Sequence, residues 1–287
     1  MNAVEIRKNA WGHSLPTPRT ALVNPRLQST LKAVLADVAG VIGVDPQTIK
    51  SVIEYLFRSA GEATDVVQLE QAMKRQLVAA SDKNLLQVAI KDRSRVVFDH
   101  ISNSFIGNTL LDVGCGNGLI SKMAGDHFAE VQLLDVVNYV DNDVRFPFMA
   151  YREGEEFALN KTFDTVLLLT VLHHSNDPLG LLSKAWRATR KRLIIIESVF
   201  GVHEQSPGAY YALASLDEED QIQFAVFVDW LYNRVLHDDI PVPYNFTTPN
   251  GWLNLFAENN MRVAEVRNLG QDIRLAPELH YLFVLER

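Results

Sequence analysis

An apolar run that leads into three alternate glycines constrains this chain more than any other feature of its sequence. Leu110 to Val113 have the character of a buried strand, and Gly114, Gly116 and Gly118 follow them. Glycine lets the chain turn sharply out of a strand and lets a ligand approach main-chain N–H groups beside the positive end of a helix. A dinucleotide loop would place a glycine or alanine at position 119, where this chain has leucine. The spacing therefore predicts a site for a nucleoside-bearing cofactor and speaks against a nicotinamide-dependent dehydrogenase.

Two further apolar runs carry polar residues at their carboxyl ends. Residues 131–137 are interrupted near their end by Asp135, at the separation at which a βαβ unit places an acid against ribose hydroxyls. Residues 163–172 lead directly into His173 and His174. Because ligands of parallel sheets bind beyond the carboxyl ends of the strands, these polar residues are expected at one edge of a sheet.

Together these residues resemble the class I S-adenosylmethionine-dependent methyltransferases, in particular the type 11 group, over roughly residues 90–287. The resemblance implies an α/β fold with a seven-stranded Rossmann-like methyltransferase sheet and helices on both faces. It also implies that S-adenosylmethionine binds through the glycine loop, the acid after strand two and an acidic residue after strand three, for which Glu153 is the best match. The expected cofactor-binding residues are Asp112, Val113, Gly114, Cys115, Gly116, Asn117, Gly118, Asp135, Val136, Glu153, Thr170, Val171 and His173.

Methyl transfer from a sulfonium is a direct displacement, for which a protein supplies position, exclusion of water and in some cases a base. The candidates for that base are His174 and His173, after the fourth predicted strand, and Glu197, at the end of the fifth. Histidine accepts protons near neutral pH, and a structural or cofactor-shaping role stays open for both histidines. No metal site is expected from these histidines and Asp177, because adjacent side chains diverge and no further ligand follows at a convincing spacing.

The order of the predicted elements divides the chain into two parts. Residues 1–104 are expected to form an arm through residue 25 and then a helical cap, with helices over 26–41, 46–60, 66–80 and 85–104. Residues 105–287 are expected to form the methyltransferase core, with strands near 109–113, 131–136, 147–151, 164–170, 192–198, 261–267 and 280–286. Between the fifth and sixth strands, residues 201–250 form a predicted lid-like insert containing one long amphipathic helix over 216–236.

Charge and composition favour a small-molecule partner. With 27 basic and 35 acidic residues the net charge is −8, which disfavours a nucleic-acid substrate. No run approaches the ~18 apolar residues of a membrane span, so no membrane partner is expected. The single cysteine and the charged amino terminus, which lacks the apolar core of a signal peptide, predict a cytoplasmic protein.

The aromatic residues of the insert favour a partly apolar methyl acceptor, of the kind found among natural products and secondary metabolites. The chain lacks the Asp- or Asn-Pro-Pro-aromatic loop and the nucleophilic cysteine of base-methylating relatives. A homo-oligomer formed through the N-terminal helices is a further hypothesis. Two alternatives stay open: a protein of this fold that binds the cofactor but catalyses a cyclisation or rearrangement, and a non-catalytic binding protein.

Overall fold

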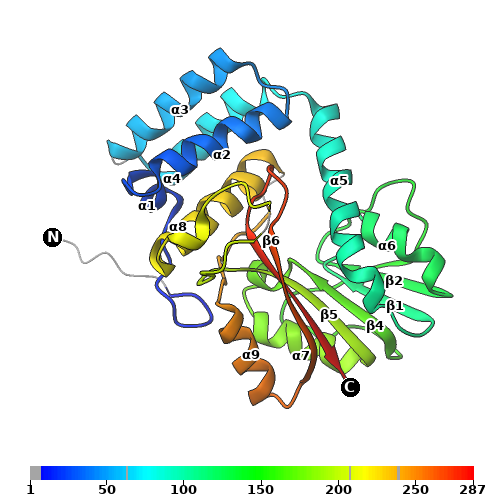
Figure 1. Ribbon diagram of the computed structural model, residues 1–287. Coiled ribbons are helices and arrows are strands. Elements are labelled where there is room, and N and C mark those ends of the chain that lie inside the picture. The colour runs from blue at the N-terminus through cyan, green and yellow to red at the C-terminus, as the bar shows by residue number, and fades with distance from the viewer. Residues whose placement is uncertain (1–7, 63, 207, 238–239) are drawn as a thin grey trace. The chain divides into compact units, whose positions relative to one another are not determined.

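The computed structural model describes residues 8–62, 64–206, 208–237 and 240–287 (Figure 1). The chain forms two compact units, each with contributions from distant parts of the sequence. Unit 1 comprises residues 1–90, 199–248 and 270–279, and unit 2 comprises residues 91–198, 249–269 and 280–287. The sequence predicted a division at residue 104, whereas the units divide at residue 90, inside helix α5 (Lys83–Ile101).

Unit 2 is built on a seven-stranded mixed sheet in the order β3-β2-β1-β4-β5-β7-β6. In chain order the strands are β1 (Thr109–Val113), β2 (Glu130–Asp135), β3 (Phe148–Ala150), β4 (Phe163–Leu169), β5 (Thr189–Val199), β6 (Arg262–Gln271) and β7 (Leu279–Glu286). The neighbouring strands from β3 through β5 pair in parallel. The Rossmann-like methyltransferase sheet predicted from the sequence is therefore confirmed.

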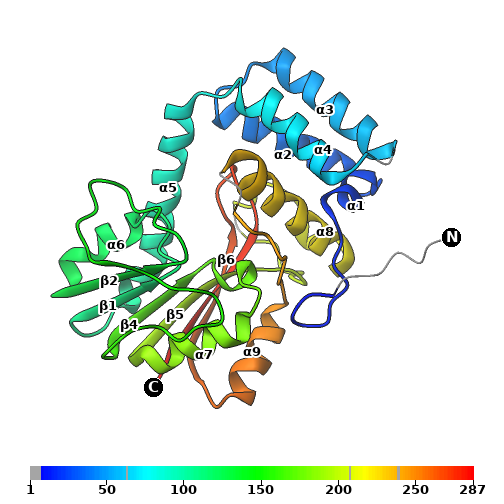
Figure 2. The ribbon, with the colours of Figure 1, turned by 180° about the vertical axis from the view of Figure 1, so that it is seen from behind.

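Apolar side chains explain why these segments form the centre of the sheet. Every residue of β4 is buried, as is every residue of β1 after Thr109. Helices lie on both faces, with α5 and α6 on one side and α7 and α9 on the other (Figures 1 and 2). The bounds of the last three are α6 (Leu119–Ala124), α7 (Pro178–Ala188) and α9 (Pro249–Glu258). This arrangement leaves the carboxyl ends of the parallel strands to the loops that carry the predicted site.

Unit 1 consists mainly of helices. They are α1 (Pro18–Val23), α2 (Gln28–Val41), α3 (Pro46–Gly61), α4 (Val66–Met73), η1 (Lys74–Val78), the start of α5, η5 (Leu213–Ser215), α8 (Glu218–Asp229) and η6 (Trp230–Leu236). Asp45 caps α3, because its carboxylate accepts hydrogen bonds from the N–H groups of Gln47 and Thr48, both at 3.0 Å. The segments η1 and η6 are π-helical, so the predicted helices over 66–80 and 216–236 each change their winding near their carboxyl ends.

The predicted N-terminal arm is wrong for part of its length. Residues 1–7 lie outside the described part of the chain, but Pro18–Val23 form α1. Thr17 begins this helix with a capping box in which its side chain and that of Thr20 each accept a backbone N–H. Pro18 occupies the first turn, where a missing N–H costs nothing. The proline that suggested an arm therefore starts a helix.

The predicted amphipathic helix over 216–236 is corrected as well. Every residue of α8 from Asp220 to Asp229 is buried, so the helix has no solvated stripe. Two polar side chains of this segment are hydrogen-bonded inside unit 1: Gln221 donates to the carbonyl of Val202 at 2.9 Å, and Asn233 of η6 donates to Asp229 at 2.6 Å. Polar residues can be buried at little cost when they are hydrogen-bonded. The pattern of polar and apolar residues along the sequence does not reveal such partners.

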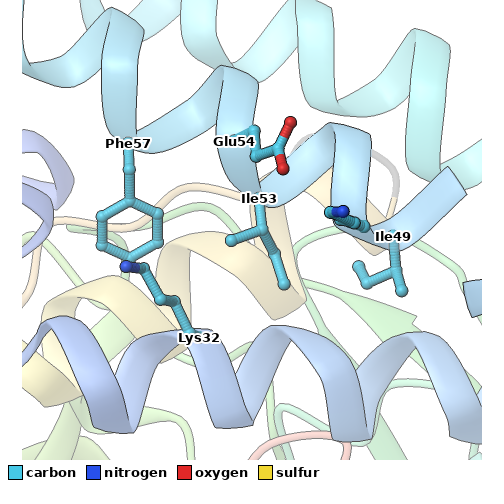
Figure 3. A pocket seen from close by; sticks show the side chains of 6 residues that line it. Lys32, Ile49, Ile53, Glu54 and Phe57 are labelled. Carbon is cyan, nitrogen blue, oxygen red and sulfur yellow. The ribbon is translucent and has the colours of Figure 1, made fainter. Parts of the chain in front are cut away.

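A pocket of about 370 Å³ lies between α2 and α3 of unit 1 (Figure 3). It is lined by Lys32, Ile49, Lys50, Ile53, Glu54 and Phe57. The ammonium group of Lys32 lies 5.0 Å from the centre of the Phe57 ring, within the range of a cation–π contact. No residue of the predicted cofactor site belongs to this pocket. Among the described residues, no helix combines the length and apolar character needed to cross a membrane.

Candidate active site

The glycine loop between β1 and α6 has the backbone shape predicted for it. Gly114, Gly116 and Gly118 all have positive φ angles, of 72°, 51° and 73°, a region that side chains with a Cβ rarely enter. A Cβ at Gly114 would lie 2.4 Å from the Val171 side chain, whereas one at Gly116 would meet no atom within 4 Å. The first glycine is therefore required by packing, and Gly116 borders open space.

The acid at the end of β2 is joined directly to this loop. Asp135 accepts a hydrogen bond from the N–H of Gly116 at 2.9 Å and one from Val136 at 2.7 Å. Its side chain is largely buried, and burial raises the pKa of Asp135 although these N–H groups oppose the shift. The structure thus brings together the two features that the sequence assigned to one cofactor. Val136 beside it is 47% exposed.

Asp112, which the sequence assigns to the cofactor site, is hydrogen-bonded to the helix that follows the glycine loop. It is buried, and its carboxylate accepts a hydrogen bond from the Ser121 hydroxyl of α6 at 2.7 Å. Burial raises the pKa of Asp112 to about 6, against the lowering effect of Ser121 and with a contribution from the charge of Asp135. The carboxylate therefore links β1 to α6. Ser121 was not identified from the sequence, because a serine two residues into a predicted helix carries no distinguishing signal.

The rest of the glycine loop contributes mainly backbone. Val113 and Cys115 are buried, and the N–H groups of Gly114 and Cys115 both donate to the Leu134 carbonyl, at 2.8 and 3.1 Å. Asn117 accepts from the N–H of residue 119 at 3.2 Å. The helix that follows has only six residues, so the shape of the loop matters more here than the dipole of α6.

Glu153 lies on the exposed segment after β3, and its carboxylate is engaged. It accepts hydrogen bonds from the Ser175 hydroxyl at 2.7 Å, from the Asn176 side chain at 2.6 Å and from the Asn176 N–H. Burial opposes ionisation, but the bonds from Asn176 and Ser175 leave the pKa of Glu153 below its usual value. These bonds connect the segment after β3 to the loop after β4. The predicted contact with adenine stays a prediction.

Tyr151 is a residue of this region that sequence reasoning missed. Its N–H donates to the Asp135 carbonyl at 3.0 Å, and its ring lies edge-on to Phe157 with centroids 5.2 Å apart. Burial, with the charges of Asp135 and Glu153, raises the pKa of the Tyr151 hydroxyl. An aromatic residue directly after a short strand could have drawn attention, since the cofactor is a nucleoside.

The loop after β4 is held by a single carboxylate. Glu197 is fully buried at the end of β5 and accepts hydrogen bonds from the N–H groups of Val171 at 2.9 Å and Leu172 at 2.7 Å. It also faces the N–H of His173 at 3.3 Å and its ring nitrogen Nδ1 at 2.7 Å. Thr170, which starts the loop, has a positive φ of 57°, a conformation that costs energy and persists where its surroundings enforce it.

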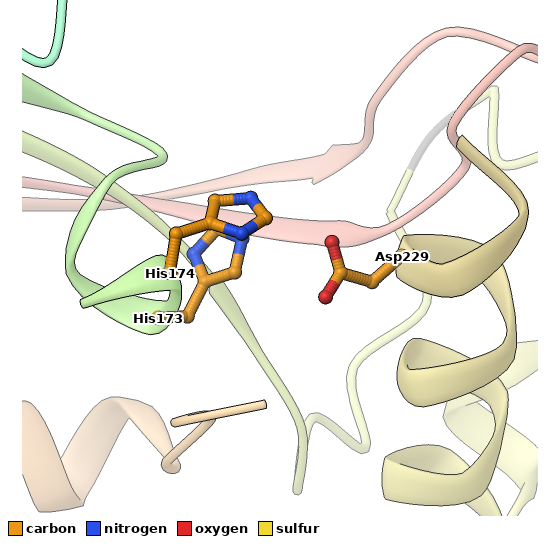
Figure 4. Close-up of side chains that lie close together, drawn as sticks. All are labelled: His173, His174 and Asp229. Atoms are coloured by element: carbon orange, nitrogen blue, oxygen red, sulfur yellow. The ribbon is translucent and has the colours of Figure 1, made fainter. Parts of the chain in front are cut away.

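The two histidines lie side by side on the short 3₁₀ turn η4 (Leu172–His174), as Figure 4 shows. Their ring centroids are 4.1 Å apart. His173 is buried and His174 is half-buried. The third side chain labelled in Figure 4, Asp229, belongs to α8 of unit 1.

Asp177, the third residue considered for a metal, has a structural role. Its carboxylate accepts a hydrogen bond from the N–H of Gly180 at 2.9 Å and thereby caps α7, with Pro178 in the first turn. The cap is the feature that Asp followed by Pro indicates at the start of a helix.

A family model described as a methyltransferase domain matches residues 69–265. A search of curated protein sequences finds no match. Among solved structures, magnesium protoporphyrin IX methyltransferase from Synechocystis PCC 6803 with bound S-adenosylmethionine is 15% identical, and the similarity covers 70% of this chain and 81% of that one with a TM-score of 0.43. An S-adenosylmethionine-dependent methyltransferase from Mesorhizobium loti is 14% identical, with coverage of 67% and 98% and a TM-score of 0.47. The cyclase SpnF is 11% identical, with coverage of 68% and 80% and a TM-score of 0.46.

Proposed function

Because this chain belongs to the family of methyltransferase domains, which use S-adenosylmethionine, we propose that it methylates a small, partly apolar acceptor of the natural-product type. The family membership accounts for the reaction class and the methyl donor. The acceptor class is inferred from the residues, and it is the part of the proposal that needs its own test.

The observation that carries the proposal is the placement of Gly116 beside Asp135. The N–H of Gly116 donates to the acid, and the position of its missing Cβ has no atom within 4 Å. A carboxylate beside open space can accept hydrogen bonds from two ribose hydroxyls, each strengthened by its charge. We assign the ribose of S-adenosylmethionine to Asp135 and its methionine part to the loop from Gly114 to Gly118.

When bound, the cofactor supplies a methyl group already activated by the positive sulfur. The residues of unit 2 then have two tasks, which are to hold the donor in line and to take a proton where the acceptor loses one. His174 is the stronger candidate for the second task, because it is half-buried whereas His173 and Glu197 are buried against each other. A hydroxyl acceptor would use such a base, and a free amine would not need it.

The basic residues of α7 and β5 support a small molecule over a nucleic acid. Arg187 pairs with Glu156 at 2.7 Å, and both Arg190 and Lys191 pair with Asp164, at 2.7 and 3.2 Å. Binding a phosphate backbone requires cations whose charge is not already neutralised by the protein. Arg187, Arg190 and Lys191 therefore already have acidic partners within this chain.

The proposal is tested in two steps. Calorimetric titration should show binding of S-adenosylmethionine and S-adenosylhomocysteine and no binding of NAD. Incubation of the enzyme and S-adenosylmethionine with a panel of hydroxylated aromatic and aliphatic natural products should release S-adenosylhomocysteine and yield a product heavier by one methylene. Binding without turnover of any acceptor, together with unmethylated rearrangement of a panel compound, would replace methyl transfer by a rearrangement activity. Failure to bind the methyl donor would refute the proposal itself.

A further inference from the structure

Glu197 presents an unusual concentration of hydrogen bonds on one buried side chain. It lies in an otherwise apolar stretch of β5, after Leu193 to Ile196, and it is fully buried. An ionised carboxylate in such a place is costly unless its oxygens receive donors. Here three backbone N–H groups and the ring nitrogen Nδ1 of His173, all from the loop after β4, face its two oxygens at 2.7 to 3.3 Å.

The division of these donors between the two oxygens is informative. Oε1 receives the N–H groups of Val171 and Leu172, and Oε2 receives the N–H and the Nδ1 of His173. An ionised carboxylate can only accept hydrogen bonds, and both oxygens of Glu197 already accept backbone N–H groups. The 2.7 Å contact between Oε2 of Glu197 and Nδ1 of His173 is therefore a hydrogen bond when Nδ1 carries the proton. Protonation at Nδ1 makes Nε2 the basic nitrogen of the neutral ring.

The same carboxylate also acts on the cofactor loop. It holds the backbone of Val171, and the Val171 side chain occupies the space beside Gly114, where a Cβ would approach it to 2.4 Å. The position of the loop after β4 thereby limits the shape of the glycine loop. One residue at the end of β5 is connected to both loops that border the proposed site.

We propose that Glu197 is the positioning residue of this active site, which fixes His173 in the form protonated at Nδ1 and holds Val171 against the glycine loop. The sequence suggested Glu197 as a base. Its burial and its contacts with this loop instead indicate that it acts through His173 and Val171. This role rests on the methyl-transfer site proposed above, although its main consequence is measurable without cofactor.

The discriminating variant is Glu197→Gln. The amide oxygen should keep accepting the N–H groups of Val171 and Leu172, because the reverse orientation would set the amide N–H groups against both of them. The amide nitrogen in place of Oε2 gives up the longer contact from the His173 N–H at 3.3 Å and can only donate to His173 Nδ1. The imidazole should therefore move its proton to Nε2. A residue that only fills space and satisfies the backbone would leave the ring unchanged.

The experiment uses the ¹⁵N-labelled full chain without cofactor and records long-range ¹H–¹⁵N correlations of the histidine rings. The His173 signals are identified by their loss in His173→Asn. The wild type should show His173 protonated at Nδ1, and Glu197→Gln should show it protonated at Nε2. The matched control is Glu286→Gln on β7, whose carboxylate pairs with Arg192 and Arg262 and does not contact the loop after β4. It should keep the wild-type form.

Calorimetry with S-adenosylhomocysteine supplies the second readout. Glu197→Gln keeps the Val171 contact, so its affinity should stay within about threefold of wild type. Glu197→Ala leaves the N–H groups of Val171 and Leu172 without their acceptor, so it should bind roughly tenfold or more weakly. If Glu197→Ala does not fold, the ring measurement on Glu197→Gln still decides. A wild-type His173 protonated at Nε2, or a ring that is identical in wild type and Glu197→Gln, overturns the proposal. Failure of the wild type to bind S-adenosylhomocysteine would instead refute the proposed function and leave the ring measurement valid.

Discussion

Replacing Asp135 by asparagine should weaken cofactor binding without disturbing the fold. Asparagine has nearly the same shape and keeps one oxygen that can accept the Gly116 N–H, now donated at 2.9 Å, while its amide nitrogen can no longer accept the Val136 N–H that the other carboxylate oxygen receives at 2.7 Å. It loses the charge and one of the two acceptor oxygens that the ribose hydroxyls would use. Hydrogen bonds to a charged group contribute about 1.5–3 kcal/mol each.

The asparagine retains part of the interaction with the ribose hydroxyls, so we expect a loss of about 2–3 kcal/mol in the free energy of cofactor binding. This corresponds to a dissociation constant roughly 30- to 150-fold higher. Burial raises the pKa of Asp135 in the free protein, which favours a neutral side chain, whereas the lost bond from Val136 opposes this gain, so the variant should unfold at a denaturant concentration close to that of wild type. A fall in affinity would then reflect lost contacts and not lost structure.

The assay is calorimetric titration with S-adenosylhomocysteine, accompanied by urea unfolding of each variant. Asp143→Asn is the matched control: it makes the same substitution in unit 2, at an exposed acid paired with Lys122, and should leave the affinity unchanged. A dissociation constant of Asp135→Asn within threefold of wild type would refute the ribose assignment. An equal loss in Asp143→Asn would show that net charge alone is responsible.

Three further predictions concern the other residues of the site. Gly116→Val should abolish cofactor binding, because its side chain would enter the open space at this position. The control is Gly12→Val, at a glycine that also has a positive φ, of 80°, and whose added Cβ would meet no atom within 4 Å; this variant should bind the cofactor normally. Normal cofactor titration of Gly116→Val would show that the loop is only a turn. Asp112→Asn should stabilise the protein at pH 7.5 but not at pH 4. The folded protein raises the pKa of Asp112 to about 6 from an ordinary value of 3.8, so the wild type loses stability as the pH rises through this range. The total loss of unfolding free energy is about 3 kcal/mol. Urea unfolding of the two proteins at both pH values measures this difference, and an equal effect at both would contradict it. His174→Asn should lower the single-turnover rate on a hydroxyl acceptor by roughly 10²- to 10⁴-fold while cofactor affinity stays within a few fold, and a near-normal rate would assign the residue a packing role.

The sheet was predictable because its strands are apolar runs separated by punctuating residues. β4 is apolar at five of its seven positions and buried at all of them, and Asp45 and Asp177 each precede a proline at the point where a helix begins. The glycine loop and Asp135 were predictable because their spacing along the chain fixes their meeting at one edge of the sheet. Local pattern and topology agree at these positions.

What the sequence did not reveal depends on partners that are distant in the chain. The bond from Ser121 to Asp112, and those from Ser175 and Asn176 to Glu153, join residues whose types predict nothing about each other. A change to π-helical winding, as in η6, leaves no trace in a 3.6-residue period. Glu197 did carry a signal, since a lone carboxylate that ends an aliphatic strand needs donors, but their identity required the structure.

The lid-like role of residues 201–250 stays a prediction of the sequence. Hydrogen exchange of this segment should slow when S-adenosylhomocysteine and an acceptor are both present. Unchanged exchange under these conditions would count against a lid.

The most direct test of the central claim is a crystal structure of the protein with S-adenosylhomocysteine. The ribose hydroxyls should lie within hydrogen-bond distance of the Asp135 carboxylate, and the homocysteine part should run along Gly114 to Gly118, filling the space beside Gly116. A cofactor bound elsewhere, or a ribose that makes no contact with Asp135, would contradict the account.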